Sequence, residues 1–78
     1  MKLTGVVTVA NAHEIWAVLA PSAEGNASID VSGVTQVDSA GLALLSALKR
    51  KAGAQCRVIG LTPKLAALAS AYDVEALF

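Results

Sequence analysis

The chain lacks most of the features that would point to a function at first sight. It contains one cysteine, Cys56, so no disulfide can form within it, which fits a reducing compartment. Six basic and six acidic residues cancel, which leaves no field that would attract nucleic acid or acidic lipid by charge alone. No apolar run approaches the roughly 18 residues of a membrane span, and the first residues lack the continuous apolar stretch of a signal peptide. The sequence predicts a cytosolic chain whose partner is a protein.

Aromatic residues are also scarce. They make up 4% of the chain against a hydrophobic fraction of 55%, so the core must consist mostly of alanine, valine, leucine and isoleucine. The 78 residues are too few for a second core. We therefore expect a single domain, residues 1–78, in which helices pack closely on a sheet.

Residues with catalytic or metal-binding chemistry are few and scattered. His13 stands beside Glu14, but adjacent residues of a helix point apart, which favours a surface role over catalysis. No nucleophile, base and orienting residue occur together, the glycines lack phosphate-loop spacing, and the metal ligands are dispersed. Cys56 is interpreted as a small buried hydrophobe and Trp16 as a packing residue. We expect no enzyme activity, no cofactor and no metal.

Alternating sequence patterns predict the element order β-α-β-α-β-α. Strands are expected over residues 3–9, 27–31 and 56–59, and helices over residues 11–20, 39–52 and 63–72. Residues 32–36 are expected to form a loop, and residues 74–78 a last half-turn or an apolar tail. This order implies parallel crossovers and an α/β fold with a small mixed or parallel sheet packed against helices.

Capping residues set the expected helix boundaries. Asn11 and Glu14 have the spacing of a capping box at the start of the first helix. Gly53 is a glycine C-cap for the second helix, and Thr62 followed by Pro63 begins the third.

The second helix has two distinct faces at about 100° per residue. One stripe should lie on the sheet and consists of Gly41, Leu44, Leu45, Leu48 and Ala52. The opposite stripe is small and weakly polar and consists of Ser39, Ala43, Ser46 and Arg50, with Leu42 and Lys49 on its border. This outward stripe fits an ordinary solvated face, or a docking surface on which Leu42 offers an apolar anchor.

Two adjacent residues, Asp38 and Ser39, can each cap this helix. If Asp38 is the N-cap, Ser39 lies in the first turn with its hydroxyl outward, and Ala40 and Gly41 are too small to shield it. A phosphate on Ser39 would be favoured by the helix dipole and opposed by the Asp38 carboxylate. Such a group would mainly alter how a partner docks.

A resemblance to STAS domains rests on residues 29–34, IDVSGV, and 37–42, VDSAGL. These segments are similar to the signature of the fold that anti-sigma factor antagonists share. Leu3-Thr4-Gly5 resembles the family's L-x-G strand. Residues 61–69, LTPKLAALA, and 72–77, YDVEAL, look like the MlaB-type branch of the family. The resemblance covers nearly the whole chain.

The resemblance implies a STAS-like fold and a non-catalytic role. MlaB-type proteins are the small cytoplasmic subunit of the Mla phospholipid ABC transporter, which contributes to the lipid asymmetry of the outer membrane. They bind the ATPase subunit, support its assembly and activity, and reach the inner membrane only through this partner. The residues expected to contact the partner are Asp38, Ser39, Ala40, Gly41, Leu42, Ala43, Ser46 and Arg50.

The resemblance also implies an alternative function. In the wider family, the Ser or Thr directly after the Asp is the regulatory phosphorylation position, which is Ser39 here. The chain would then be an anti-sigma factor antagonist that phosphorylation of Ser39 switches.

One departure from the family pattern concerns the sheet. Family members usually have an additional strand before the L-x-G strand, and Lys2-Leu3 leave no room for it. The sheet edge formed by residues 3–9 is therefore expected to be less protected, which favours self-association.

Overall fold

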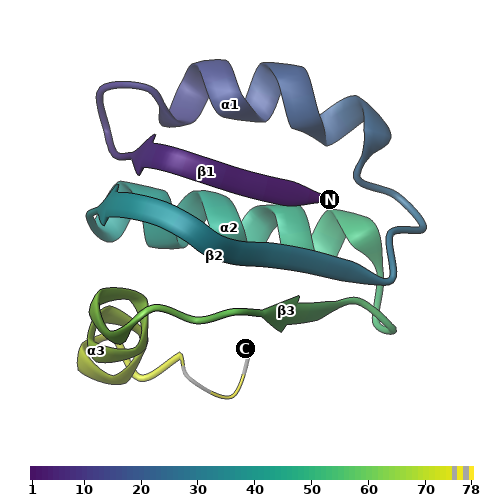
Figure 1. The fold of residues 1–78 in the computed structure, drawn as a ribbon. Helices are drawn as coiled ribbons and strands as arrows, with labels where there is room; N and C mark the ends of the chain where they lie inside the picture. The colour runs from purple at the N-terminus through teal and green to yellow at the C-terminus, as the bar shows by residue number, and fades with distance from the viewer. Residues whose placement is uncertain (75, 77) are drawn as a thin grey trace.

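The predicted element order is present in the computed structural model, which describes residues 1–74, 76 and 78 (Figure 1). The strands are β1 (Lys2–Val7), β2 (Ser28–Val37) and β3 (Arg57–Ile59). The helices are α1 (Ala12–Leu19), α2 (Ser39–Ala52) and α3 (Pro63–Ala71), and a short 3₁₀ helix, η1 (Ala20–Ser22), follows α1. The expected C-terminal half-turn or tail includes residues 75 and 77, which lie outside the described residues.

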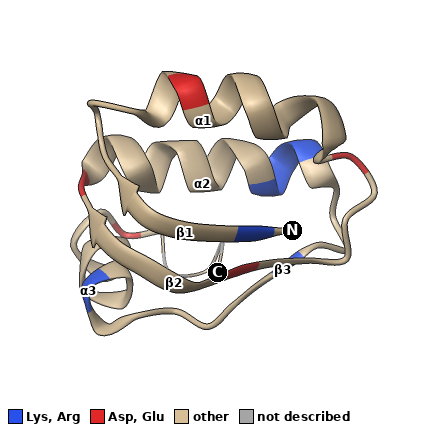
Figure 2. Ribbon diagram, turned by 45° about the horizontal axis from the view of Figure 1, so that its top comes forward, with Lys and Arg blue, Asp and Glu red and all other residues tan. Residues whose placement is uncertain are grey.

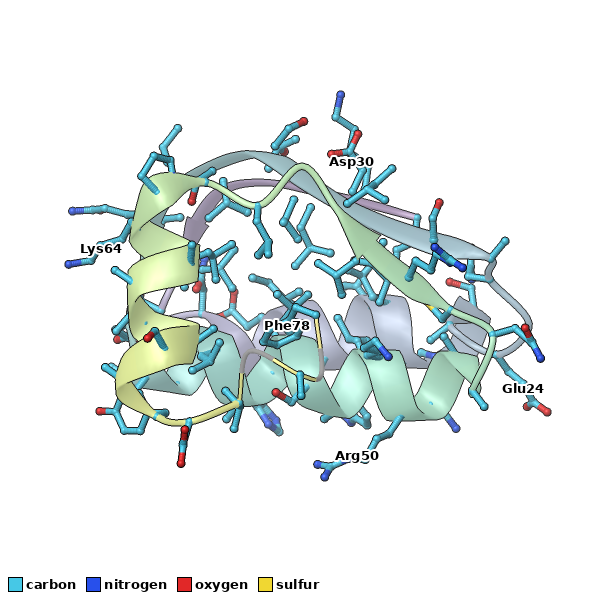
Figure 3. All side chains as sticks on the ribbon, turned by 90° about the horizontal axis from the view of Figure 1, so that it is seen from below. Glu24, Asp30, Arg50, Lys64 and Phe78 are labelled. Atoms are coloured by element: carbon cyan, nitrogen blue, oxygen red, sulfur yellow. The ribbon has the colours of Figure 1, made fainter. Side chains whose placement is uncertain are left out.

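The sheet has the strand order β1-β2-β3, and both strand pairs are parallel. This confirms the predicted α/β fold with a parallel sheet. Figure 3 shows α1 and α2 on one side of the sheet, while Asp30 points away from the other side. Helix α3 lies across one end of this arrangement and packs on α2.

Strand β2 is longer than the sequence predicts. The prediction of a loop over residues 32–36 is wrong, because β2 continues to Val37. Its register against β1 shifts twice, once opposite Lys2 to Thr4 and once opposite Gly5 to Val6. Each shift adds a residue to β2 in the manner of a β-bulge. The added residues interrupt the alternation of buried and exposed side chains, which is the pattern that identifies a strand in a sequence.

The core is aliphatic, as the composition predicts. Its largest fully buried side chains are Ile29, Val31, Leu45, Leu48 and Leu65. All members of the predicted sheet-facing stripe of α2 are buried, which confirms that face: Gly41, Leu44, Leu45, Leu48 and Ala52.

Three further packing residues lie around this core. The Cys56 side chain is buried with its thiol free, as predicted. The Trp16 side chain packs partly buried against the core, which confirms its packing role. Phe78 also packs against the core and points between the sheet and α2 (Figure 3).

The capping-box prediction for α1 is wrong. Asn11 occupies the N-cap position, but its side chain makes no hydrogen bond to the helix. Its Oδ1 accepts the backbone N–H of Thr8 at 2.9 Å, and its Nδ2 donates to the carbonyl oxygen of Val6 at 2.6 Å. The side chain therefore bonds to β1 and the residue that follows it, because no strand among the described residues pairs with β1 on that side.

The other predicted caps are confirmed. The Thr62 hydroxyl accepts the backbone N–H of Leu65 at 3.3 Å at the start of α3, and Pro63 follows in the first turn. Gly53 ends α2 with a φ of 116°, a conformation that a side chain would strain, and its N–H donates to the carbonyl of Lys49.

Candidate functional site

Asp38 organises the start of α2 with both of its carboxylate oxygens. Oδ1 accepts the backbone N–H of Gly41 at 3.0 Å, and Oδ2 accepts the backbone N–H of Val9 at 3.0 Å. Asp38 is therefore the N-cap, which decides between the two capping alternatives. The N–H of Val9, followed by that of Gly41, holds the pKa of this carboxyl below its ordinary value of 3.8. The site thus has a fixed negative charge at neutral pH.

Ser39 begins α2 with an exposed side chain. Because Asp38 caps the helix, the Ser39 hydroxyl is not required for capping. Ala40 beside it is half-buried and short. The structure thus places Ser39 in the first turn and on the surface, as expected if Asp38 is the cap.

Gly41 lies where α2 packs against the ends of β1 and β2. A Cβ at this position would collide with the carbonyl oxygen of Val7 and lie 2.8 Å from Cγ2 of Val37. The absence of a side chain therefore lets α2 approach the ends of β1 and β2. Gly41 is buried, so it sets the position of the helix and offers no side chain to a partner.

The position of Leu42 differs from the prediction. The sequence places it on the border of the outward stripe as an apolar anchor, but its side chain is only 4% exposed and belongs to the core cluster. The physical reason is that α3 packs on α2, and Leu65 and Ala69 of α3 belong to the same core cluster as Leu42. Leu42 therefore cannot serve as a protruding anchor.

A surface hollow of about 240 Å³ lies between α2 and the end of α3. Its lining residues are Ser39, Leu42, Ala43, Ser46, Tyr72 and Val74. The buried Leu42 forms its floor, and Ala43 is exposed at its side. The Ser46 hydroxyl donates to the carbonyl oxygen of Leu42 at 3.0 Å, so its donor is used within the helix. The Tyr72 side chain is 56% exposed and leaves a large apolar ring open to a partner.

Tyr72 and Val74 are site residues that the sequence reasoning missed. The chain turns at Asp73, whose φ is 60°, and closes the end of α3 with two backbone hydrogen bonds. The N–H of Asp73 donates to Ser70 at 3.1 Å, and that of Val74 donates to Ala69 at 2.9 Å. This is a Schellman motif with Asp in the place that glycine usually takes. Because position 73 is not a glycine, no local sequence signal indicated that the chain turns back toward α2 after α3.

Val9 is a third residue that sequence reasoning missed. Its side chain is 76% exposed, and its N–H is bonded to Asp38. The loop after β1 is therefore held at the N-terminal end of α2 by Asp38, the residue before Ser39. No sequence signal links positions 9 and 38, because the contact spans two elements.

Arg50 lies apart from the other predicted site residues. At 1.5 Å per residue it is roughly 16 Å along α2 from Ser39. It lines a different hollow of about 270 Å³ together with Ser46, Lys49, Gly53 and Ala54. Figure 2 shows the basic residues of α2 gathered at this C-terminal end. The predicted outward stripe thus has a neutral part around Ala43 and a basic part around Arg50, and Ser46 lines both hollows.

The residues of the hollow suit contact between surfaces. Its walls are mostly small or apolar side chains, and Ser39, Ser46 and Tyr72 contribute hydroxyl groups. Within residues 1–74, 76 and 78, no three His, Cys, Asp or Glu side chains are grouped so that they could hold a metal ion. Over the same residues, no helix has the length and apolar character needed to span a membrane.

The three parallel strands and three helices are consistent with a STAS-like fold. The sequence model of the family described as "Mlab, STAS domain" matches residues 1–78. The chain belongs to this MlaB-type STAS family, as the sequence resemblance indicated. A search of curated proteins returned no match.

Proposed function

We propose that this chain is the non-catalytic STAS subunit of an Mla-type phospholipid ABC transporter and binds its ATPase subunit. Membership of the MlaB-type family supports the class of complex. The observation that carries the binding site is the hollow between α2 and α3, which leaves Ala43 and Tyr72 exposed beside Ser39. In this role the chain supports the assembly and activity of the ATPase and contributes to the lipid asymmetry of the outer membrane.

The geometry of the hollow suits a partner that inserts an apolar side chain. Ala43 and Ser39 are short, so a partner's backbone can approach α2 closely. Leu42 provides an apolar floor, and Tyr72 provides the kind of aromatic side chain that often dominates binding energy. Interfaces concentrate their affinity in such small desolvated clusters.

This proposed role implies a location for the chain. It is cytoplasmic and reaches the inner membrane only through the ATPase subunit. Arg50 extends the contact toward the C-terminal end of α2, because its hollow shares Ser46 with the hollow between α2 and α3. Val9 extends it at the other end, where its exposed side chain is held by the bond of its N–H to Asp38.

Co-purification with the ATPase subunit of the same organism's Mla-type transporter tests this proposal. The wild-type chain is expected to co-purify, and Ser39→Glu is expected to lower the yield of complex, because it places a charge at the rim of an apolar contact. Leu42→Asp is unsuitable as a test, since Leu42 is buried and the variant would not fold. His13→Glu is the matched control, because it adds an acidic residue on exposed α1. Equal yields for wild type, Ser39→Glu and His13→Glu would contradict the binding site.

The alternative is an anti-sigma factor antagonist that is switched at Ser39. The observation that favours it is the exposed Ser39 hydroxyl, which Asp38 releases from any capping role. Incubation with an anti-sigma factor kinase and ATP would then add one phosphate, which mass spectrometry locates at Ser39. Failure to modify the chain, together with co-purification of the ATPase, favours the transporter subunit.

A further inference from the structure

Strand β1 is at an edge of the sheet, with β2 as its neighbour on one side (Figure 1). Among the residues that the structure describes, no strand pairs with its other side. The N–H of Asp30 donates to the carbonyl of Met1 at 2.8 Å, so Met1 faces β2. Because successive residues of a strand alternate, the backbone groups of Lys2, Thr4 and Val6 face the outer edge.

The side chain of Asn11 closes part of this edge. Its Nδ2 donates to the carbonyl of Val6 at 2.6 Å, and its Oδ1 accepts the N–H of Thr8 at 2.9 Å. A residue of a neighbouring parallel strand opposite Val7 would bind the same two groups with its own N–H and C=O. A carboxamide has the donor and the acceptor of a peptide group, so Asn11 bonds these two groups as a residue of a further strand would.

We propose that the outer edge of β1 is a pairing surface for a second copy of this chain and that Asn11 keeps it closed. Two copies of β1 can pair antiparallel about a two-fold axis at Thr4. Thr4 then lies opposite Thr4, and Lys2 lies opposite Val6, so no like charges meet across the pair. The pairing needs the carbonyl of Val6 in both copies, and Asn11 occupies that carbonyl and the space beside it.

Removal of the Asn11 side chain tests this inference, which does not rest on the proposed transporter function. Multi-angle light scattering after size exclusion is expected to show a monomer for wild type and a dimer for Asn11→Ala. The dissociation constant of the Asn11→Ala dimer should be at least about tenfold lower than that of wild type. The reason is that the Val6 carbonyl of each copy, freed from Asn11, gains a backbone hydrogen bond in the dimer. Asn11→Ser is a second variant that places a residue type favoured at N-caps at the start of α1, and it is also expected to dimerise.

Asn26→Ala is the matched control for loss of stability. The Asn26 amide donates to the carbonyls of Ser22 and Ala23 at 2.6 and 3.0 Å, so its loss also removes side-chain hydrogen bonds. These bonds lie in the loop before β2, and the Asn26 Oδ1 accepts the terminal ammonium of Met1 at 3.4 Å, so the variant loosens the start of β1 while Asn11 stays in place. Asn26→Ala is therefore expected to remain monomeric.

A disulfide trap locates the pairing surface. Residues directly opposite each other in a hydrogen-bonded antiparallel pair have Cα atoms about 5.5 Å apart, which a disulfide can span. Asn11→Ala with Thr4→Cys should form a cross-linked dimer, while Asn11→Ala with Thr35→Cys on exposed β2 should not. The native Cys56 is buried and does not interfere. The inference is overturned if folded Asn11→Ala and Asn11→Ser are as monomeric as wild type. It is equally overturned if Thr4→Cys cross-links as readily with Asn11 present.

Discussion

Asp38 accepts the backbone N–H of Val9 across 29 positions of sequence, with the same carboxylate that caps α2. This contact joins the loop after β1 to the first turn of α2. The exposed Val9 side chain and the exposed Ser39 side chain are thereby held at one end of the molecule. Asp38 was expected to contact a partner, and in the structure its oxygens are engaged within the chain, where they shape the surface around Ser39.

Asp38→Asn should separate these two functions of the side chain. An asparagine retains one acceptor oxygen, but its NH₂ group cannot accept a hydrogen bond. We expect α2 to remain capped and the Val9 amide to exchange its hydrogen severalfold faster, as measured by hydrogen exchange with NMR. Asp30→Asn, which alters the carboxylate that accepts the Ser32 N–H at 2.9 Å, should leave Val9 unchanged. Unaltered protection of Val9 in Asp38→Asn would show that the contact does not hold the loop.

The free energy of unfolding should decrease at acid pH because Asp38 and Asp30 become protonated. Backbone hydrogen bonds, from Val9 to Asp38 and from Ser32 to Asp30, lower the pKa of each carboxyl below 3.8. The unfolded chain therefore binds more protons than the folded chain in this range, so the stabilisation is complete above 3.8 and is lost as the pH falls through the lowered pKa values. The urea midpoint, followed by fluorescence of Trp16, should fall between about pH 5 and about pH 2.5.

A double variant tests whether these two carboxyl groups cause the pH dependence. The combined variant Asp30→Asn and Asp38→Asn lacks both carboxyl groups, so its urea midpoint should fall less steeply over the same range. An identical slope in this variant and in wild type would contradict the assignment.

Gly41→Ala should destabilise the fold, although alanine usually stabilises a helix relative to glycine. The new methyl group would collide with the carbonyl of Val7, and we expect a loss of about 1–3 kcal/mol in the free energy of unfolding. Ala43→Gly lies on the exposed face of the same helix and should lose only about 1 kcal/mol, from helix propensity. Denaturant unfolding measures both values. A Gly41→Ala variant as stable as wild type would show that α2 can move away from β1 without cost.

Much of α2 was predictable because its two faces follow from residue spacing alone. The buried stripe depends on residues within a few positions of one another. The choice between Asp38 and Ser39 as the cap stayed open in the sequence, and the bond from the Gly41 N–H to Asp38 decides it. Leu42 was not predictable, because its burial depends on where α3 packs. Tyr72 was missed for the same reason, since it is the C-cap of α3 and its place depends on how α3 packs. Val74 follows the turn at Asp73, for which no local signal was recognised.

The sheet was less predictable than the helices. Two register shifts in β2 interrupt the alternation of buried and exposed residues. Its polar residues, such as Ser32 and Gln36, are then typical of a loop. Asn11 was assigned to the nearest helix because its type and spacing suit an N-cap. In the structure, the Asn11 side-chain amide bonds to the outer edge of β1 instead. The sequence does not show that β1 is an edge strand, because this depends on the strand order.

Tyr72→Ala should separate binding from folding. The side chain is 56% exposed, so we expect a change of less than about 1 kcal/mol in unfolding free energy. Its loss should weaken binding to the ATPase subunit roughly tenfold, as for an aromatic contact at the centre of an interface. Val18→Ala removes a side chain that is 73% exposed on α1 and should leave the affinity unchanged. Equal affinities for the two variants would place the contact elsewhere.

The affinity of folded Ala43→Arg for the ATPase subunit, measured by biolayer interferometry, tests the central claim most directly. Ala43 is exposed in the hollow between α2 and α3, and an arginine there would fill the space that the partner needs. We predict that binding weakens at least about 30-fold, which corresponds to a hot-spot loss of ~2 kcal/mol. Ala17→Arg, at an exposed alanine of α1, should bind like wild type. Wild-type affinity in folded Ala43→Arg would contradict the assignment of this hollow as the partner-binding site.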